Sequence, residues 1–318
     1  MKDAVLQVVV HKAEQQGAGV LVLDLYSASD AGLPVFEAGA HVDVHLPGGL
    51  VRQYSLCGDP ADRSRYRLGV LKDPTSRGGS KALHGTLREG TVVTISAPRN
   101  LFPLAGNAGR SLLLGGGIGI TPMIAMAYAL HASGADFELH YCGRSRSHAA
   151  FIDELAQAPF ADRVITHFDD EPASKLDLQR VLGNPAGDGH VYTCGPSGFM
   201  AWVIDGARAA GYRDEQVHRE YFQVEVDNSG GAFEVHTART GKTLQVQAGQ
   251  SIVHALAEVG IAVEVSCEQG VCGTCLCDVL EGEPDHRDVY LTDDERAAND
   301  QMLLCCSRSR SGRLVLDI

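Results

Sequence analysis

Short runs that alternate between apolar and polar residues fill the first third of the chain. Several repeat with a period of two, which a strand with one buried face requires. Turn-forming residues separate the runs, as in Pro47-Gly48-Gly49 and Asp59-Pro60. We therefore expect an antiparallel β-barrel over residues 1–104, with strands at residues 5–10, 20–25, 41–46, 51–56, 66–71 and 91–96.

The pattern changes at Ser111, where apolar strands begin to alternate with helical stretches. Such alternation is typical of an α/β domain with a parallel sheet, whose ligand binds outside the carboxyl ends of the strands. Thr121 and Pro122 suit the N-cap and first position of a helix. For residues 105–225 we expect strands at residues 112–114, 137–141, 164–168 and 190–193, and helices at residues 124–132, 149–157 and 197–210.

A polar segment at residues 226–232 follows and contains Asn228-Ser229-Gly230-Gly231. Because composition and pattern both change here, we interpret it as a flexible linker rather than an ordinary surface turn. Beyond it, residues 233–237 and 243–246 predict a hairpin, and residues 251–258 predict a short helix that Ser251 caps.

The last part of the chain, residues 233–318, contains four cysteines in an informative spacing. Cys267, Cys272 and Cys275 form a C-x4-C-x2-C motif, and Cys305 follows after 29 intervening residues. This is the plant-type [2Fe–2S] arrangement, in which four thiolates reach two irons. A zinc site would favour paired C-x2-C knuckles, and unrelated buried thiols would not need a glycine-rich loop. With the predicted hairpin and short helix, these residues match a compact α+β, ferredoxin-like (β-grasp) domain.

Three further motifs could bind phosphate or an aromatic ring, although each also has an ordinary structural explanation. In the strand end Arg52-Gln53-Tyr54-Ser55, the guanidinium of Arg52 could donate to a phosphate and the ring of Tyr54 could stack on an aromatic ring. In the turn Gly78-Gly79-Ser80, the exposed backbone and a hydroxyl could approach a phosphate. The loop GGGIGITPM at residues 115–123 precedes a helix N-terminus, which suits a pyrophosphate. Cys194-Gly195-Pro196 could simply be a strand-to-helix turn with a buried thiol.

The glycine loop disfavours a plain Rossmann dehydrogenase. Gly115 and Gly117 fit the G-x-G-x-x-G fingerprint, but Ile120 stands at its third glycine position. No acidic residue ends the second strand to bind a ribose, because residues 141–146, YCGRSR, stand there instead.

Composition and charge narrow the class of protein. The 318 residues are 44% hydrophobic and 21% charged, which is ordinary for a globular chain of two or three domains. A net charge of −13 makes nucleic acid or an anionic membrane a poor partner. Nine cysteines without an apolar signal-peptide core lead us to expect a reducing cytoplasm rather than a disulfide framework.

Together, and in this order, the motifs R-x-Y-S, GG-x-GI-x-P and CGP-x-x-x-M resemble those of the ferredoxin-NADP⁺ reductase superfamily. With a plant-type ferredoxin at the C-terminal end, the chain resembles the phthalate dioxygenase reductase family, which includes reductase subunits of vanillate O-demethylase. The resemblance covers essentially the whole chain and extends to the run PDHRDVYLTDDE at residues 284–295, for which the sequence suggests no chemical role.

The resemblance implies FMN in the barrel, NADH on the α/β domain and a [2Fe–2S] cluster in the last domain. For the FMN phosphate it implies Arg52 and Ser80, with Gly78 and Gly79 lining the turn. Near the isoalloxazine ring it implies Tyr54, Ser55, Leu71, Lys72, Thr121 and Phe222. For NADH it implies Gly116 and Gly117, Arg144 and Ser145 near the ribose, and Cys194, Gly195 and Pro196 beside the nicotinamide. The implied cluster ligands are Cys267, Cys272, Cys275 and Cys305.

Some positions leave alternatives open. Cys306 duplicates the last ligand position and Cys277 adds a nearby thiol, but Cys305 aligns with the family's Cys-x-Ser-Arg ending. Arg144 and Arg146 could hold a 2′-phosphate, so NADPH is an alternative to NADH. FAD is likewise an alternative to FMN.

The expected chemistry follows from electron counting. A nicotinamide delivers two electrons as hydride, a [2Fe–2S] cluster accepts one at a time, and a flavin between them can do both. We therefore expect an NADH-dependent reductase that serves a Rieske-type oxygenase or O-demethylase of aromatic compounds. The alternatives are a reductase for a cytochrome P450 or another haem acceptor, and an electron carrier whose first two domains are only structural.

The ferredoxin domain carries roughly twice as many acidic as basic residues. An acidic rim around a partly exposed cluster would steer a basic partner to it. A face that merely keeps the protein soluble would have the same composition. The acidic residues include Asp278, Glu281, Glu283, Asp293, Asp294 and Glu295.

Overall fold

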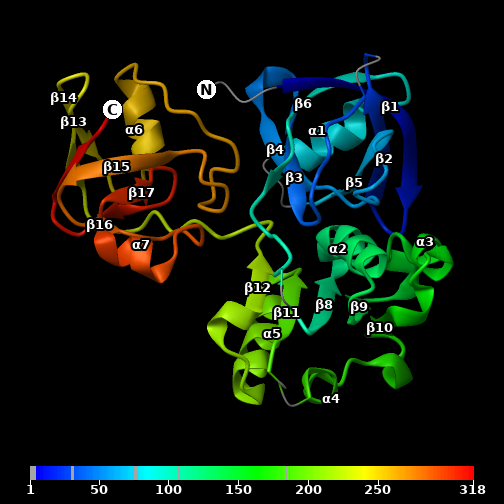
Figure 1. Cartoon of the computed structure of the whole chain (residues 1–318). Coiled ribbons are helices and arrows are strands. Elements are labelled where there is room, and N and C mark those ends of the chain that lie inside the picture. Colours follow the sequence, from blue (N-terminus) through cyan, green and yellow to red (C-terminus); the bar gives the residue numbers. More distant parts are fainter. Residues whose placement is uncertain (1–4, 30–31, 75–77, 107, 184, 186) are drawn as a thin grey trace. The chain divides into compact units, whose positions relative to one another are not determined.

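The structure is a computed structural model that describes the chain except for residues 1–4, 30–31, 75–77, 107, 184 and 186. It divides into two compact units, Met1–Phe222 and Gln223–Ile318. The first unit contains an antiparallel and a parallel sheet, and the second contains a mixed sheet (Figure 1). In the described part of the chain, no helix is both long enough and apolar enough to cross a membrane.

The antiparallel sheet of the first unit has seven strands in the order β4-β3-β6-β1-β2-β5, with β7 paired to β3. A bridge between Leu56, just after β4, and Leu68 of β5 connects the two ends, so the sheet closes into a barrel. The helix α1 (Gly79–Thr86), absent from the sequence prediction, follows β5. The strands are β1 (Val5–Gln16), β2 (Val20–Ser27), β3 (Ala40–His45), β4 (Val51–Ser55), β5 (Arg65–Leu71), β6 (Val92–Ser96) and β7 (Arg99–Asn100).

The parallel sheet has five strands in the order β10-β9-β8-β11-β12. Its strands are β8 (Arg110–Gly116), β9 (Phe137–Gly143), β10 (Val164–Phe168), β11 (Gly189–Cys194) and β12 (Val217–Glu220). The chain runs outward from β8 to β10 on one side and continues with β11 on the other side. The ends of β8 and β11 therefore form the topological switch point, where ligands of such sheets bind.

The helices of this domain differ in detail from the prediction. They are α2 (Ile120–Ser133), α3 (Ile152–Gln157), α4 (Leu178–Leu182) and α5 (Ser197–Ala210). The predicted N-cap at Thr121 is wrong, because Gly119 is the N-cap and Thr121 lies inside the helix. Its hydroxyl donates back to the carbonyl of Ile118, three residues earlier, instead of capping an N–H group. Short 3₁₀ turns occupy Pro47–Gly49, Gly117–Gly119, Arg146–His148, Ala161–Arg163, Pro172–Ser174 and Asp214–Gln216.

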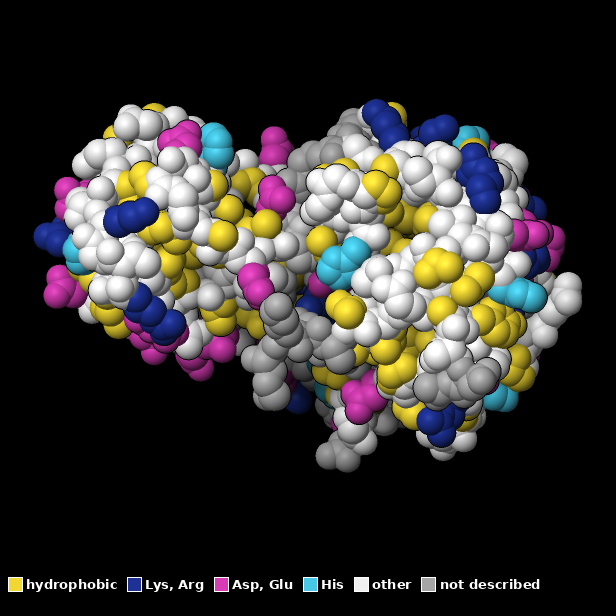
Figure 2. Space-filling view, turned by 90° about the horizontal axis from the view of Figure 1, so that it is seen from above, with side chains coloured by type: hydrophobic (Ala, Val, Ile, Leu, Met, Phe, Trp, Pro, Cys, Tyr) yellow, Lys and Arg dark blue, Asp and Glu magenta, His cyan; other side chains and the backbone are white. Residues whose placement is uncertain are grey.

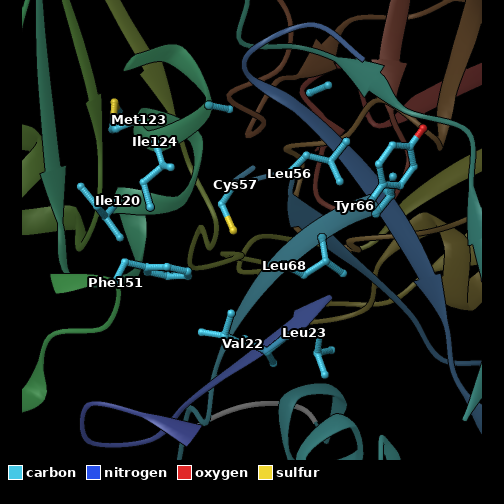
Figure 3. Packing of buried hydrophobic residues seen from close by; sticks show 14 of the residues in the cluster. Val22, Leu23, Leu56, Cys57, Tyr66, Leu68, Ile120, Met123, Ile124 and Phe151 are labelled. Atoms are coloured by element: carbon cyan, nitrogen blue, oxygen red, sulfur yellow. The ribbon is translucent and has the colours of Figure 1, made fainter. Parts of the chain in front are cut away.

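One hydrophobic core joins the barrel to the α/β domain. Leu56 and Leu68 of the barrel face Ile120 and Phe151 of the α/β domain within a single buried cluster (Figure 3). The side chain of Gln16 crosses the same junction, since it accepts from the backbone N–H of Phe151. Continuous burial of apolar area explains why the two domains form one compact unit.

The second unit contains a five-stranded mixed sheet in the order β14-β13-β19-β15-β17. The strands β13 (Phe233–Thr237) and β14 (Lys242–Val246) form the predicted hairpin, and β13 is parallel to β19 (Arg313–Leu316). Ser251 caps α6 (Ile252–Glu258) by accepting from the N–H of His254, as predicted. The remaining elements are β15 (Leu276–Glu281), β16 (Pro284–Asp285), α7 (Asp293–Ala298), β17 (Gln301–Leu303) and β18 (Arg308–Ser309).

Two arginines bind the segment that the sequence marks as a linker. Arg287 donates to the carbonyls of Asp227 and Ser229, and Arg308 donates to the carbonyl of Gly231. Residues 227–231 are therefore anchored to the second unit by backbone carbonyl groups.

Candidate cofactor sites

Arg52 lies at the N-terminal end of α1. A Cβ atom on Gly79 would lie only 2.6 Å from Cγ of Arg52, so the absence of a side chain there lets the arginine approach the helix. Gly78, the N-cap, has a φ of 91°, which a glycine adopts without strain. A cation beside the positive end of a helix is favourable where an anion binds between them. This arrangement fits a phosphate group.

The end of β5 is tied to the same helix. The hydroxyl of Ser80, which is buried, accepts from the N–H of Asp73. Leu71 and Lys72, immediately before Asp73, have exposed side chains. The structure thus brings Ser80 and the Leu71–Lys72 strand end together.

Tyr54 and Ser55 lie at the end of β4. Tyr54 is half-buried, and burial raises the pKa of its phenol. The hydroxyl of Ser55 is buried and donates to Oε2 of Glu220 at 3.0 Å, so the barrel contacts the parallel sheet here.

Glu220 is a site residue that the sequence analysis missed. It ends β12 directly beside Cys194 of β11 in the parallel register. Burial raises the pKa of its carboxyl to about 8, and the hydrogen bond from Ser55 partly opposes that shift. Burial also raises the pKa of the Cys194 thiol, and the neighbouring Glu220 adds to this effect. The sequence did contain a feature that could have pointed to Glu220: it is an acidic residue two positions before Phe222, which the resemblance places near the flavin ring.

Thr121 and Phe222 both belong to the junction between the two domains of the first unit. The methyl group of Thr121 would lie 2.9 Å from a Cβ on Gly69 of β5, so the helix approaches the barrel backbone closely. Phe222 packs against the shared hydrophobic core.

The glycines at the switch point serve two different purposes. A Cβ on Gly119 would lie 2.2 Å from the carbonyl oxygen of Cys194, and one on Gly116 would lie 2.7 Å from the ring of Phe199. These two glycines allow the end of β8 and the turn after it to pack against the end of β11 and the start of α5. Gly117 has a φ of 56° and open space around it, which suits a ligand that approaches the backbone. Gly195 and Pro196 follow β11 directly.

The loop after β9 meets an acidic segment that the sequence analysis did not single out. The N–H of Asp170 donates to the carbonyl of Arg144, which places residues 169–171 beside Arg144 and Ser145. Arg146 lies 3.5 Å from Glu171, and its guanidinium stacks 4.9 Å above the ring of Phe168. The positive charge of Arg146 is therefore already paired.

The four predicted cluster cysteines are buried and meet in two pairs. The thiol of Cys267 hydrogen-bonds to Cys272, and the thiol of Cys275 hydrogen-bonds to Cys305. The first bond lowers the pKa of Cys272 to about 5. In the described part of the chain, no three His, Cys, Asp or Glu side chains form a site for a single metal ion. Two pairs of thiols suit a two-iron cluster, in which each iron takes two protein ligands.

The loop between these cysteines depends on its glycines. Gly270 and Gly273 have φ angles of 72° and 74°, which glycine adopts readily. The N–H of Gly270 donates to the sulfur of Cys305. The sulfur of Cys306 lies 2.6 Å from where a Cβ on Gly270 would be, so it packs behind the loop. Cys277 is half-buried, and burial raises the pKa of its thiol to about 11.

Comparison with known proteins places the chain in a family. Residues 235–310 match the model of the 2Fe-2S iron-sulfur cluster binding domain. The chain is 56% identical to the vanillate O-demethylase oxidoreductase of Pseudomonas putida over 92% of this chain and 93% of that protein. It belongs to the vanillate O-demethylase oxidoreductase family.

Solved structures are similar to this chain over almost its whole length. A phthalate dioxygenase reductase, described as a modular structure for electron transfer from pyridine nucleotides to [2Fe-2S], has a TM-score of 0.76 and 37% identity. The similarity covers 99% of this chain and 98% of that reductase. An intact type IV self-sufficient cytochrome P450 monooxygenase has a TM-score of 0.86 and 38% identity over 99% of this chain, but over only 41% of its own length. The chain is therefore an oxidoreductase with the three-module fold of phthalate dioxygenase reductase.

Proposed function

We propose that this chain passes electrons from NADH through FMN and a [2Fe–2S] cluster to a Rieske-type oxygenase or O-demethylase of aromatic compounds. The observation that carries the proposal is the two pairs of buried thiols in the same chain as the Ser55–Glu220–Cys194 constellation at the switch point. The free thiols also favour a reducing cytoplasm as its location.

Each domain has residues that fit one cofactor. In residues 1–104, Arg52, Ser80 and the start of α1 would bind the FMN phosphate, with Gly78 and Gly79 lining the turn. Tyr54, Ser55, Leu71, Lys72, Thr121 and Phe222 would surround its ring. In residues 105–225, Gly116, Gly117, Arg144, Ser145, Cys194, Gly195 and Pro196 would bind NADH. Residues 226–232 link these domains to residues 233–318, where Cys267, Cys272, Cys275 and Cys305 would bind the iron.

The bound flavin supplies the step between hydride transfer and single-electron transfer. The polypeptide would orient the flavin and the nicotinamide, and it holds one proton on the carboxyl group of Glu220. At pH 7 the buried carboxyl of Glu220 is protonated, since its pKa is about 8, and it accepts from the hydroxyl of Ser55. A neutral acid beside Cys194 adds no negative charge to the place where the nicotinamide would lie.

NADH fits this site better than NADPH. Arg146 is paired with Glu171 and stacked on Phe168, so it is poorly placed to serve a 2′-phosphate. The acidic residues 169–171 at the same edge would repel such a phosphate and could accept from a ribose hydroxyl. A kcat/KM for NADPH equal to that for NADH would contradict this assignment.

The purified chain tests the proposal directly. After reconstitution with FMN, iron and sulfide, we expect two irons and one flavin per chain and NADH-driven reduction of ferricyanide. Arg52→Ala should lower flavin retention, because a charged phosphate donor is lost. A colourless protein without iron or flavin would refute the proposal. An iron-containing chain that fails to oxidise NADH would favour the electron carrier instead.

A haem acceptor is the second candidate, because this chain also resembles the reductase part of a self-sufficient cytochrome P450. Stopped-flow mixing of the NADH-reduced chain with a purified Rieske oxygenase and with a purified P450 distinguishes the two. We expect fast oxidation of the cluster by the Rieske protein and slow oxidation by the P450.

A further inference from the structure

The run at residues 284–295 has no part in the cofactor contacts described above, yet it lies directly against the cluster loop. The Cα and Cβ atoms of Asp288 are 3.0 and 3.1 Å from where a Cβ on Gly270 would be. The N–H of Val289 donates to the carbonyl of Gly270 at 3.0 Å. The ring of Tyr290 lies 2.4 Å from the corresponding position on Gly273. The turn formed by residues 288–291 thus contacts both glycines that separate the cluster cysteines.

The carboxylate of Asp288 determines the shape of this turn. Its side chain is fully buried, and its Oδ2 accepts from the N–H groups of both Tyr290 and Leu291, at 3.1 and 2.8 Å. The side chain of Arg296, from α7, donates to the carbonyl of Asp288 at 2.6 Å. Backbone and side chain of one residue are therefore both fixed, which is typical of an Asx turn that supports a neighbouring loop.

The charge of Asp288 is buried close to that loop. Its nearest oppositely charged partner is Arg296, 3.8 Å from Oδ2, and His286 lies 3.9 Å from Oδ1. Oδ1 itself is buried without a hydrogen-bond partner in the part of the chain that the structure describes. A buried, incompletely paired carboxylate costs stability, so a role beyond stability accounts better for its presence.

We propose that Asp288 is a positioning residue for the iron–sulfur centre. Its carboxylate holds the turn against Gly270 and Gly273, and so fixes the Gly270 N–H that donates to the sulfur of Cys305. Its negative charge lowers the reduction potential of the centre. The hydrogen bonds and charges around a metal site tune its potential and its retention in this way. The inference rests on the [2Fe–2S] cluster of the proposed function.

Two variants separate the geometry of Asp288 from its charge. In Asp288→Asn the amide oxygen can replace Oδ2 and accept from both N–H groups, so the turn is kept and only the charge is lost. In Asp288→Ala the turn loses both hydrogen bonds as well. Asp293→Asn is the matched control, because this residue belongs to the same run and its side chain is fully exposed.

Potentials are measured on the full reconstituted chain by a redox titration followed by electron paramagnetic resonance, and cluster loss is followed by absorbance in the presence of a chelator. We expect both Asp288 variants to shift the potential to more positive values. Asp288→Ala should also change the resonance line shape and lose the cluster about tenfold faster or more. Asp293→Asn should match the unmodified chain in all three measurements.

The outcomes are distinguishable. If the unmodified chain binds no iron, the proposed function fails. If it binds the cluster and both Asp288 variants retain its potential and lifetime, or if Asp293→Asn shifts the potential as much as Asp288→Asn, only the present inference fails. Should Asp288→Ala not fold, as judged by circular dichroism, Asp288→Asn alone decides. An Asp288→Asn chain that folds but takes up no cluster would overturn the inference, because the amide is expected to keep both the turn and the cluster.

Discussion

The buried carboxyl of Glu220 makes the stability of the chain depend on pH. Its pKa in the folded state is about 8, above the usual value of 4.5, so the folded chain keeps a proton that the unfolded chain releases. Stability should therefore fall as pH rises from about 5 to 8.

Glu220→Gln should remove this dependence, because an amide does not titrate. Between pH 5 and pH 8 we expect the free energy of unfolding of the variant to fall less steeply than that of the unmodified chain, by up to ~1.4 kcal/mol per pH unit. Urea denaturation at pH 5.5, 6.5 and 7.5 measures the two slopes. Glu37→Gln, at an exposed position of the same unit, should leave the slope unchanged. Parallel curves for Glu220→Gln and the unmodified chain would contradict the burial of an acid here.

Cys305 and Cys306 are neighbours in sequence but differ in their contacts. Cys305 receives the N–H of Gly270 and pairs with Cys275, whereas Cys306 packs behind Gly270. Cys305→Ser should abolish the visible absorption of the cluster and its iron, while NADH-driven ferricyanide reduction through the flavin continues. Cys306→Ser should retain both irons. If Cys306→Ser loses the cluster and Cys305→Ser retains it, the fourth ligand is Cys306 and the assignment of Cys305 is wrong.

At the scale of elements, the period-two runs of the barrel and the apolar runs of the parallel sheet correctly predicted most strands, because local burial determines them. Elements that depend on tertiary contacts were missed. The turn Gly78-Gly79-Ser80 begins α1, although two glycines disfavour a helix, and β12 (Val217–Glu220) is a short edge strand without a strong pattern. The start of α2 was misplaced because Thr121-Pro122 is a stronger cap signal than Gly119.

The candidate sites divide in the same way, into residues that local sequence indicates and residues that only tertiary contacts bring together. The four cysteines and the Arg52 and Ser80 motifs could be proposed as candidates from spacing and resemblance. Glu220 and Asp288 could not, since each acquires its role only when a distant segment comes close: Ser55 in the first case and Gly270 in the second.

Arg308 stabilises the second unit from within. It is 2% exposed, and its guanidinium donates to the carbonyls of Gln250, Gly231 and Gln247. Arg308→Ala would leave these acceptors without a donor, and we expect a loss of about 3 kcal/mol in the free energy of unfolding. Guanidinium denaturation followed by cluster absorbance measures it. Arg310→Ala, at a side chain that is 60% exposed, is the control and should cost far less.

At the scale of the whole molecule, the second unit carries both acidic side chains and exposed apolar side chains on its surface. Acidic and hydrophobic side chains are interspersed over its surface in the space-filling view (Figure 2). Leu276, beside Cys275, and Val289, beside the cluster loop, are 37% and 39% exposed. Exposed apolar side chains together with acidic side chains on one domain suit a docking surface for a basic partner.

If this acidic surface steers the oxygenase to the cluster, the bimolecular rate of electron transfer should fall as ionic strength rises. Screening shortens the Debye length from about 30 Å at 0.01 M salt to about 10 Å at 0.1 M, so most of the fall should occur within this range. Stopped-flow mixing of the reduced chain with its oxygenase at several salt concentrations measures it. Charge reversal at Asp293 and Asp294 should flatten the dependence, whereas reduction of the chain by NADH in the same buffers serves as a control for salt effects within the reductase. A profile that is flat for the unmodified chain would show that the acidic residues only keep the protein soluble.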